Sequence, residues 1–167
     1  MTGEHLSPDI QELVRLFARH RVRYLLVGGE AVIHHGYARL TGDVDFFYDR
    51  SRSNCRRLYE ALREFWGGEV PAVASPDDLL ADDVVVQFGR PPNRIDLIAS
   101  LGRLRFSSAW QRREKERLEL RSQTVTLPII SLRDLLRAKR EAGRPKDLDD
   151  IEHLVAVEAL RRRRRRR

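Results

Sequence analysis

Cysteine is nearly absent from this chain of 167 residues, in which Cys55 is the only one. A single cysteine cannot form a disulfide within the chain, and it fits a reducing compartment, so we expect a cytoplasmic protein. No stretch approaches the ~20 apolar residues that a membrane helix needs. The first ten residues, MTGEHLSPDI, also lack the charged start and apolar core of a secretory signal. These absences argue against a disulfide-stabilised fold and against a membrane as partner.

An excess of positive charge is also absent outside the C-terminal end. The formal net charge is +7, but Arg161–Arg167 account for seven of the 32 lysines and arginines, which leaves 25 basic against 25 acidic side chains. A run of seven arginines repels itself and buries no surface, so we expect a disordered tail or a frayed extension of a helix. Such a tail can bind RNA phosphates with release of counterions. The alternative is a solvated tail without a binding role.

The rest of the chain, residues 1–160, has the length of one ordinary domain. Runs of β-forming residues predict strands at 24–27, 44–48, 84–88, 94–98, 118–121 and 124–130, with the third and fourth strands paired as a hairpin. Apolar residues at helical spacing predict helices at about 8–20, 30–35, 52–65, 107–117, 132–141 and 147–160. The fold class is therefore α/β: a small mixed β-sheet with helices mainly on one face, plus C-terminal helices. We expect Cys55 to lie in the core, because it falls on the apolar stripe of its helix.

Three aspartates are the candidate catalytic and metal-binding residues. Asp43 and Asp45 lie two apart on one strand, so their side chains share a face, with Cα atoms roughly 6.6 Å apart. Asp96 lies in the hairpin between apolar neighbours that face the core, which places it on the opposite face with Arg94. Carboxylates so spaced can share two Mg²⁺ ions, with Asp96 completing the acceptor-side ion and helping to deprotonate an attacking hydroxyl. The alternative is three surface acids on edge strands.

A glycine pair follows the first strand, where a phosphate-binding turn would be needed. Gly28 and Gly29 let the backbone approach a triphosphate closely, and the helix that follows presents free N–H groups at its start. The alternative is a plain turn from strand to helix. Arg39 and Thr41 come just before Asp43, where a loop can contact a phosphate, and the arginine fork suits that contact.

These residues occur in a recognisable order. Gly28, Gly29 and Ala31 match Gly-Gly-x-Ala, and Arg39, Thr41, Asp43 and Asp45 match Arg-x-Thr-x-Asp-h-Asp, where h is apolar. The stretch resembles the DNA polymerase β-like nucleotidyltransferase superfamily. It is most similar to the small branch found in toxin–antitoxin and abortive-infection systems, and the resemblance covers about residues 13–160.

A second segment downstream resembles the Lys-x-x-Ala-Gly-Arg-x-Lys-Asp-x-x-Asp motif of the same family. By that resemblance, Lys139 or Lys146 reaches the nucleotide phosphates and Arg144 supports the site. Asp147 and Asp150 would orient these basic groups. Considered without the resemblance, a lysine and a helix start with aspartate in its first turn are ordinary structural features.

The resemblance implies an Mg²⁺-dependent enzyme that transfers NMP from an NTP to a hydroxyl acceptor with two Mg²⁺ ions. The acceptor it implies is RNA, such as a tRNA 3′ end, or a protein side chain. It also implies a toxin paired with an antitoxin, and a small-molecule acceptor would require a homodimer. The alternative is a non-catalytic module that binds nucleotide, RNA or a partner protein. Gly29 in place of the superfamily's common serine, and Glu30 beside the turn, favour that alternative.

A histidine metal site is not expected from the sequence. His34 and His35 are neighbours, and adjacent residues cannot share one face of a helix. The other histidines have no partners at the spacing of metal ligands.

Overall fold

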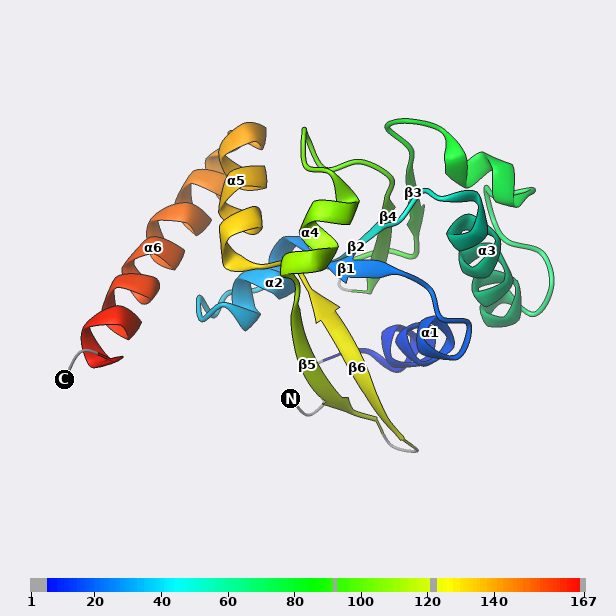
Figure 1. The fold of residues 1–167 in the computed structure, drawn as a ribbon. Helices are drawn as coiled ribbons and strands as arrows, with labels where there is room; N and C mark the ends of the chain where they lie inside the picture. The colour runs from blue at the N-terminus through cyan, green and yellow to red at the C-terminus, as the bar shows by residue number, and fades with distance from the viewer. Residues whose placement is uncertain (1–5, 92, 121–122, 166–167) are drawn as a thin grey trace.

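The computed structural model describes residues 6–91, 93–120 and 123–165. One six-stranded sheet has the strand order β3-β4-β2-β1-β6-β5 (Figure 1). The strands are β1 (Tyr24–Leu26), β2 (Asp43–Tyr48), β3 (Val85–Phe88), β4 (Arg94–Ile98), β5 (Glu114–Glu119) and β6 (Thr124–Ile129). β1 pairs antiparallel with β2 and parallel with β6, and β2 pairs parallel with β4. The sheet is therefore mixed, which confirms the predicted fold class, and β1 is central as its unbroken apolar character indicates.

Six α-helices accompany the sheet in the described residues: α1 (Pro8–Arg19), α2 (Gly28–His34), α3 (Arg52–Trp66), α4 (Phe106–Arg112), α5 (Leu132–Ala142) and α6 (Pro145–Arg165), with a 3-10 helix η2 at Pro76–Leu80. Local sequence explains several of their ends. The hydroxyl of Ser7 accepts a hydrogen bond from the N–H of Ile10 and caps α1, and Ser131 caps α5 in the same way. Gly143 ends α5 in the left-handed conformation, with φ of +61°.

The two faces of the sheet are covered by different helices. Side chains alternate along each strand, so Tyr24 and Phe46 share a face on which α1 and α3 pack. Phe17 of α1 contacts both rings, with centroid distances of 5.0 and 5.5 Å. The opposite face is covered in part by α4, whose Phe106 ring lies 5.2 Å from that of Phe47. Cys55 lies in the core as predicted, and burial raises the pKa of its thiol to about 11.

The prediction of a helix over residues 107–117 is wrong at its C-terminal half. α4 ends at Arg112, and β5 begins at Glu114, several residues before the predicted strand. β5 is an edge strand in which only Leu118 is buried, so its sequence is charged and carries almost no apolar alternation. Its partner β6 determines its conformation through backbone hydrogen bonds. Residue 121, at the end of the strand predicted for 118–121, lies outside the described residues.

α6 stands at the side of the molecule, next to α5 and far from α1 and α3 (Figure 1). Leu154 is fully buried, whereas Leu148 and Val155 are exposed. Arg161–Arg165 continue α6, which agrees with the alternative that the arginine tail extends a helix. Residues 166 and 167 lie outside the described part. Among the described residues, no helix has both the length and the apolar character needed to cross a membrane.

Candidate active site

The parallel pairing of β2 and β4 brings the three aspartates together. Its register places Asp43 beside Arg94 and Asp45 beside Asp96. As a result, one carboxylate oxygen from each of Asp43, Asp45 and Asp96 lies within 4.8 Å of the others. Oxygen-only ligands of this kind suit Mg²⁺, which prefers carboxylates and water to nitrogen or sulfur.

The charge of this carboxylate triad is poorly compensated at Asp45. Burial, and then the charges of Asp43 and Asp96, raise the pKa of Asp45 to about 6, against the opposing effect of Arg94 and Lys146. Asp45 is hard to ionise because of burial and because two other carboxylates lie beside it. A bound divalent cation offsets this repulsion. The three residues therefore fit a Mg²⁺ site in both chemistry and electrostatics.

Arg94 supplies positive charge inside the triad, a role that the sequence did not reveal. Its Nη2 atom donates to Asp43 Oδ2 at 2.6 Å, and its Nε atom donates to Asp96 Oδ1 at 2.9 Å. Gln87 from β3 adds a hydrogen bond of 3.1 Å to Asp96 Oδ2. The guanidinium thus lies where it competes with a cation for two of the three carboxylates.

The glycine pair is required by the packing of the site itself. α2 begins at Gly28, whose φ is +59°, and a Cβ atom there would overlap the carboxylate of Asp45. A Cβ atom on Gly29 would overlap the hydroxyl of Thr41. That hydroxyl donates to Asp43, lying 3.0 Å from Oδ1 and 3.1 Å from the backbone oxygen. The absence of two side chains therefore lets the start of α2 lie directly against the triad.

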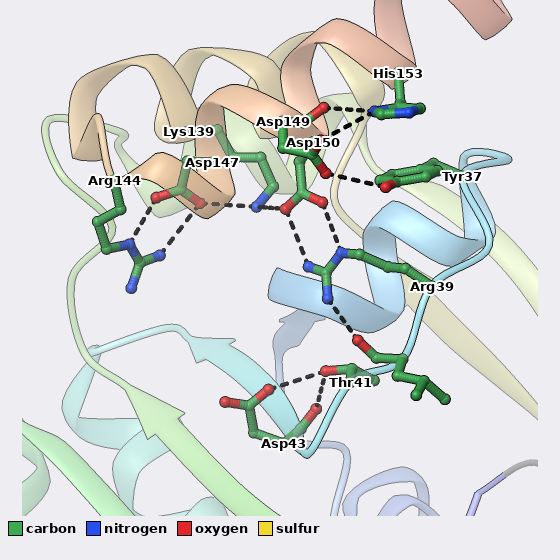
Figure 2. A network of polar contacts seen from close by, with 11 residues as sticks. Tyr37, Arg39, Thr41, Asp43, Lys139, Arg144, Asp147, Asp149, Asp150 and His153 are labelled. Carbon is green, nitrogen blue, oxygen red and sulfur yellow. Dashed lines mark hydrogen bonds and ion pairs between the residues drawn. The ribbon is translucent and has the colours of Figure 1, made fainter.

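The residues of the downstream motif form a buried ionic network (Figure 2). Lys139 Nζ lies 3.0 Å from Asp147 Oδ1 and 2.7 Å from Asp150 Oδ2, and all three side chains are buried. Arg39 binds Asp150 through two hydrogen bonds of 2.6 and 3.0 Å. Arg144 binds Asp147 with a shortest distance of 2.6 Å. The network joins α5, α6 and the loop before β2 into one unit.

This network determines which basic groups are buried and which are exposed to a ligand. Burial acts to raise the pKa of Asp150, but hydrogen bonds from Arg39 and Lys139 hold it below its ordinary value. Against the same effect of burial, hydrogen bonds from Arg144 and Lys139 hold the pKa of Asp147 below its ordinary value, so both aspartates are ionised, and Lys139 donates to both. By contrast, the side chain of Arg144 is 75% exposed and Lys146 is exposed, and both are close enough for their charges to act on Asp45.

A small cavity of about 60 Å³ lies between the glycine turn and this network. Gly28 and Val27 line it on one side, and Lys139, Arg144 and Asp147 line it on the other. The cavity connects the two motifs that lie more than a hundred residues apart in the sequence. A further contact joins the segment after α2 to α6: the Tyr37 ring stacks on His153 with a centroid distance of 4.0 Å, as Figure 2 shows near Asp149.

A mixed sheet with three convergent carboxylates beside a glycine-led helix is the architecture of a nucleotidyltransferase-like protein. The model of the family described as "Nucleotidyltransferase of unknown function (DUF6036)" matches residues 4–161. This match spans nearly the whole chain, so the chain belongs to that family. It confirms the resemblance at the level of nucleotidyltransferases. No curated protein matches the chain in sequence.

Proposed function

We propose that this protein is an Mg²⁺-dependent nucleotidyltransferase that transfers NMP from an NTP to a hydroxyl acceptor. The observation that carries the proposal is the convergence of one carboxylate oxygen each from Asp43, Asp45 and Asp96 within 4.8 Å. Family membership supports the reaction class. The raised pKa of Asp45 supports a cation as the missing partner of the triad.

In this proposal Asp43 and Asp45 hold two Mg²⁺ ions, and Asp96 completes the acceptor side. When bound, the ions neutralise charge on the transferred phosphoryl group and align the attacking and leaving oxygens. The acceptor oxygen forms a bond to the α-phosphorus of the NTP. The bond from that phosphorus to the bridging oxygen breaks, and pyrophosphate leaves with the electron pair. Asp96 takes the hydroxyl proton once Arg94 has moved away from it.

Phosphate binding is assigned to backbone and basic groups around the small cavity. Gly28 is partly exposed and lines the cavity, so its backbone is the part of the glycine turn that can meet a phosphate, whereas Gly29 is buried against Thr41. Arg144 and Lys146 supply the charge, because their side chains are exposed and act electrostatically on the triad. Lys139 acts as a positioning residue, since both of its carboxylate partners are buried.

Arg39 and Thr41 are also assigned positioning roles. Arg39 is tied to Asp150 and holds the loop before β2 against α6. Thr41 orients Asp43 through its hydroxyl. Asp147 and Asp150 orient the basic side chains, in line with the motif resemblance. Both phosphate-binding and positioning residues therefore come from segments that the ionic network links.

For the acceptor we propose RNA, such as a tRNA 3′ end, with a protein side chain as the second candidate. The motif similarity to toxin–antitoxin proteins motivates this choice and a toxin role with an antitoxin partner. The exposed arginines at positions 161–164 add a site for RNA phosphates at the end of α6. Deleting Arg161–Arg167 should then weaken RNA binding and flatten its salt dependence, whereas an unchanged salt slope counts against the tail.

A non-catalytic binding module is the alternative function. Gly29 in place of serine favours it, as does the occupation of two triad carboxylates by Arg94. Such a module would bind nucleotide without transferring any part of it. A homodimer would be required only for a small-molecule acceptor that a second copy helps to enclose.

Label transfer distinguishes these functions. Purified protein, Mg²⁺ and each α-labelled NTP are incubated with total RNA and with cell extract, beside an Asp43→Ala/Asp45→Ala control. Label in RNA or in a protein band that disappears in the control supports the enzyme and identifies both the nucleotide and the acceptor class. Nucleotide binding without label transfer for every NTP refutes the enzymatic proposal.

A further inference from the structure

A second group of metal-ligating side chains lies at the far end of α2. His34 is the last residue of that helix, His35 follows it, and Glu114 is the first residue of edge strand β5. One ligand atom from each of these three residues lies within 4.8 Å of the others. The spacing argument against a histidine pair did not consider this arrangement, and the expectation that these histidines bind no metal stays a prediction to be tested. The two rings use different nitrogens, Nε2 of His34 and Nδ1 of His35, and the third ligand comes from a distant strand.

Hydrogen bonding prepares His35 as a ligand. Its side chain is buried, and its Nε2 atom lies 2.9 Å from the backbone oxygen of Ile130. A carbonyl oxygen only accepts hydrogen bonds, so Nε2 carries the proton and the lone pair of the neutral ring is on Nδ1. Nδ1 lies 3.9 Å from Glu114 Oε1, which is too far for a hydrogen bond. Metal-binding histidines are typically oriented by such a bond from the other nitrogen to a carbonyl.

The distances match the edges of a tetrahedral zinc site. With bonds of 2.0–2.2 Å from Zn²⁺ to nitrogen or oxygen, neighbouring ligand atoms lie about 3.4 Å apart. His34 Nε2 and Glu114 Oε2 are 3.1 Å apart and hydrogen-bonded, and His35 Nδ1 lies 3.9 Å from the other carboxylate oxygen, Oε1, so both distances are near this edge length although they involve different oxygens. Small side-chain movements would therefore bring the three ligand atoms to the positions of a tetrahedral site. A water molecule would occupy the fourth position.

We propose that His34, His35 and Glu114 bind a transition-metal ion of the Zn²⁺ class, at a site separate from the carboxylate triad. Two imidazoles select against Mg²⁺, which prefers oxygen ligands. The ion links the end of α2 to β5. α2 has seven residues, and its first residue, Gly28, packs on Asp45. Because the helix is so short, an ion bound at its last residue also fixes the end that packs on Asp45. The proposal does not depend on the catalytic function.

One neighbouring charge opposes the ion. The guanidinium of Arg161 on α6 lies near Gly36, and its positive charge acts on His35. Arg161 is exposed, so its removal should be tolerated by the fold. Replacing it should strengthen metal binding, because the like charge is removed. A structural role of the histidine pair alone would give no such effect.

Titration of the metal-free full chain with ZnCl₂ tests the proposal, with Co²⁺ absorbance as a probe of geometry. In the Asp43→Asn/Asp45→Asn background we expect one ion per chain, an affinity loss of at least about tenfold on adding His34→Gln or Glu114→Gln, and tighter binding on adding Arg161→Ala. His20→Gln is the matched control, because it removes the histidine from another histidine–glutamate pair, 2.8 Å apart. Asp43→Asn/Asp45→Asn should leave the Zn²⁺ site intact.

Circular dichroism shows whether each variant is folded. His34 is partly exposed, so His34→Gln should retain the wild-type spectrum. The absence of Zn²⁺ binding in the Asp43→Asn/Asp45→Asn background overturns the proposal. Binding in that background that is unchanged by His34→Gln and Glu114→Gln, or that is lost to the same degree on adding His20→Gln, overturns it as well.

Discussion

Replacing Asp45 with asparagine should stabilise the metal-free protein at high pH and not at low pH. The pKa of Asp45 in the folded state is about 6, above its ordinary value of 3.8. Protonation therefore favours the folded state, and the wild type loses stability as the pH rises from about 4 through 6. An asparagine is neutral at every pH, so the Asp45→Asn variant escapes this loss.

The size of the expected stabilisation follows from the shift in the pKa of Asp45. A shift of about 2 pKa units corresponds to about 3 kcal/mol, and the solvent around a partly exposed side chain reduces this to about 2 kcal/mol. For a chain of this length 1 kcal/mol changes Tm by about 2–4 °C. At pH 8 in EDTA, Tm of the Asp45→Asn variant should exceed that of the wild type by about 4–8 °C. At pH 3, Asp45 is protonated in both the folded and the unfolded wild type, so the two Tm values should nearly coincide, whereas at pH 5 about half of the difference should already be present.

Mg²⁺ should reverse the order, because it stabilises the wild-type triad and loses a ligand in the variant. Glu69→Gln removes an exposed carboxylate outside the triad and should show neither effect. Thermal unfolding of wild type, Asp45→Asn and Glu69→Gln at pH 3, pH 5 and pH 8, with EDTA or Mg²⁺, measures each of these differences in stability. An Asp45→Asn variant that is less stable than wild type in EDTA at pH 8 would refute the reasoning about the triad.

Four further substitutions separate effects on stability from effects on activity and metal binding. Lys139→Met should lower the free energy of unfolding in urea by about 2–3 kcal/mol, because it removes a partner from two buried carboxylates; a loss below 0.5 kcal/mol would contradict the buried network. Lys146→Met should change stability by no more than about 0.5 kcal/mol and reduce label transfer by roughly 10²-fold, and full activity would remove Lys146 from the site. Gly28→Ala should abolish label transfer and lower Tm, since its Cβ overlaps Asp45, so a fully active variant would disprove that overlap. Arg94→Gln should bind Mg²⁺ more tightly in calorimetry, because a competing cation is gone, and weaker binding would show instead that Arg94 holds the carboxylates in place.

The sheet and the triad were predictable because both depend on local patterns. Alternation along β2 places Asp43 and Asp45 on one face, and the turn around Pro91 joins β3 to β4. Asp96 faces the same side because its strand neighbours are apolar. The sequence did not contain the parallel register of β2 and β4, which brings Asp45 beside Asp96. That register depends on the packing of the whole sheet.

The parts that could not be predicted depend on long-range contacts. Lys139 looks like a phosphate ligand in the sequence, and its burial depends on how α5 and α6 pack. The contact of His34 with Glu114 depends on β5, an edge strand that shows no apolar alternation. The position of Arg94 inside the triad depends on a side-chain conformation that no sequence pattern specifies.

The central claim is that the triad transfers the α-phosphoryl group with its nucleoside. The most direct measurement uses NTP labelled at the α position in one sample and at the γ position in another, with the identified acceptor and Mg²⁺. The account predicts α label in the acceptor, γ label in released pyrophosphate in equal amount, and the loss of both in Asp43→Ala/Asp45→Ala. Appearance of γ label in the acceptor, or of neither product while the nucleotide is bound, would contradict it.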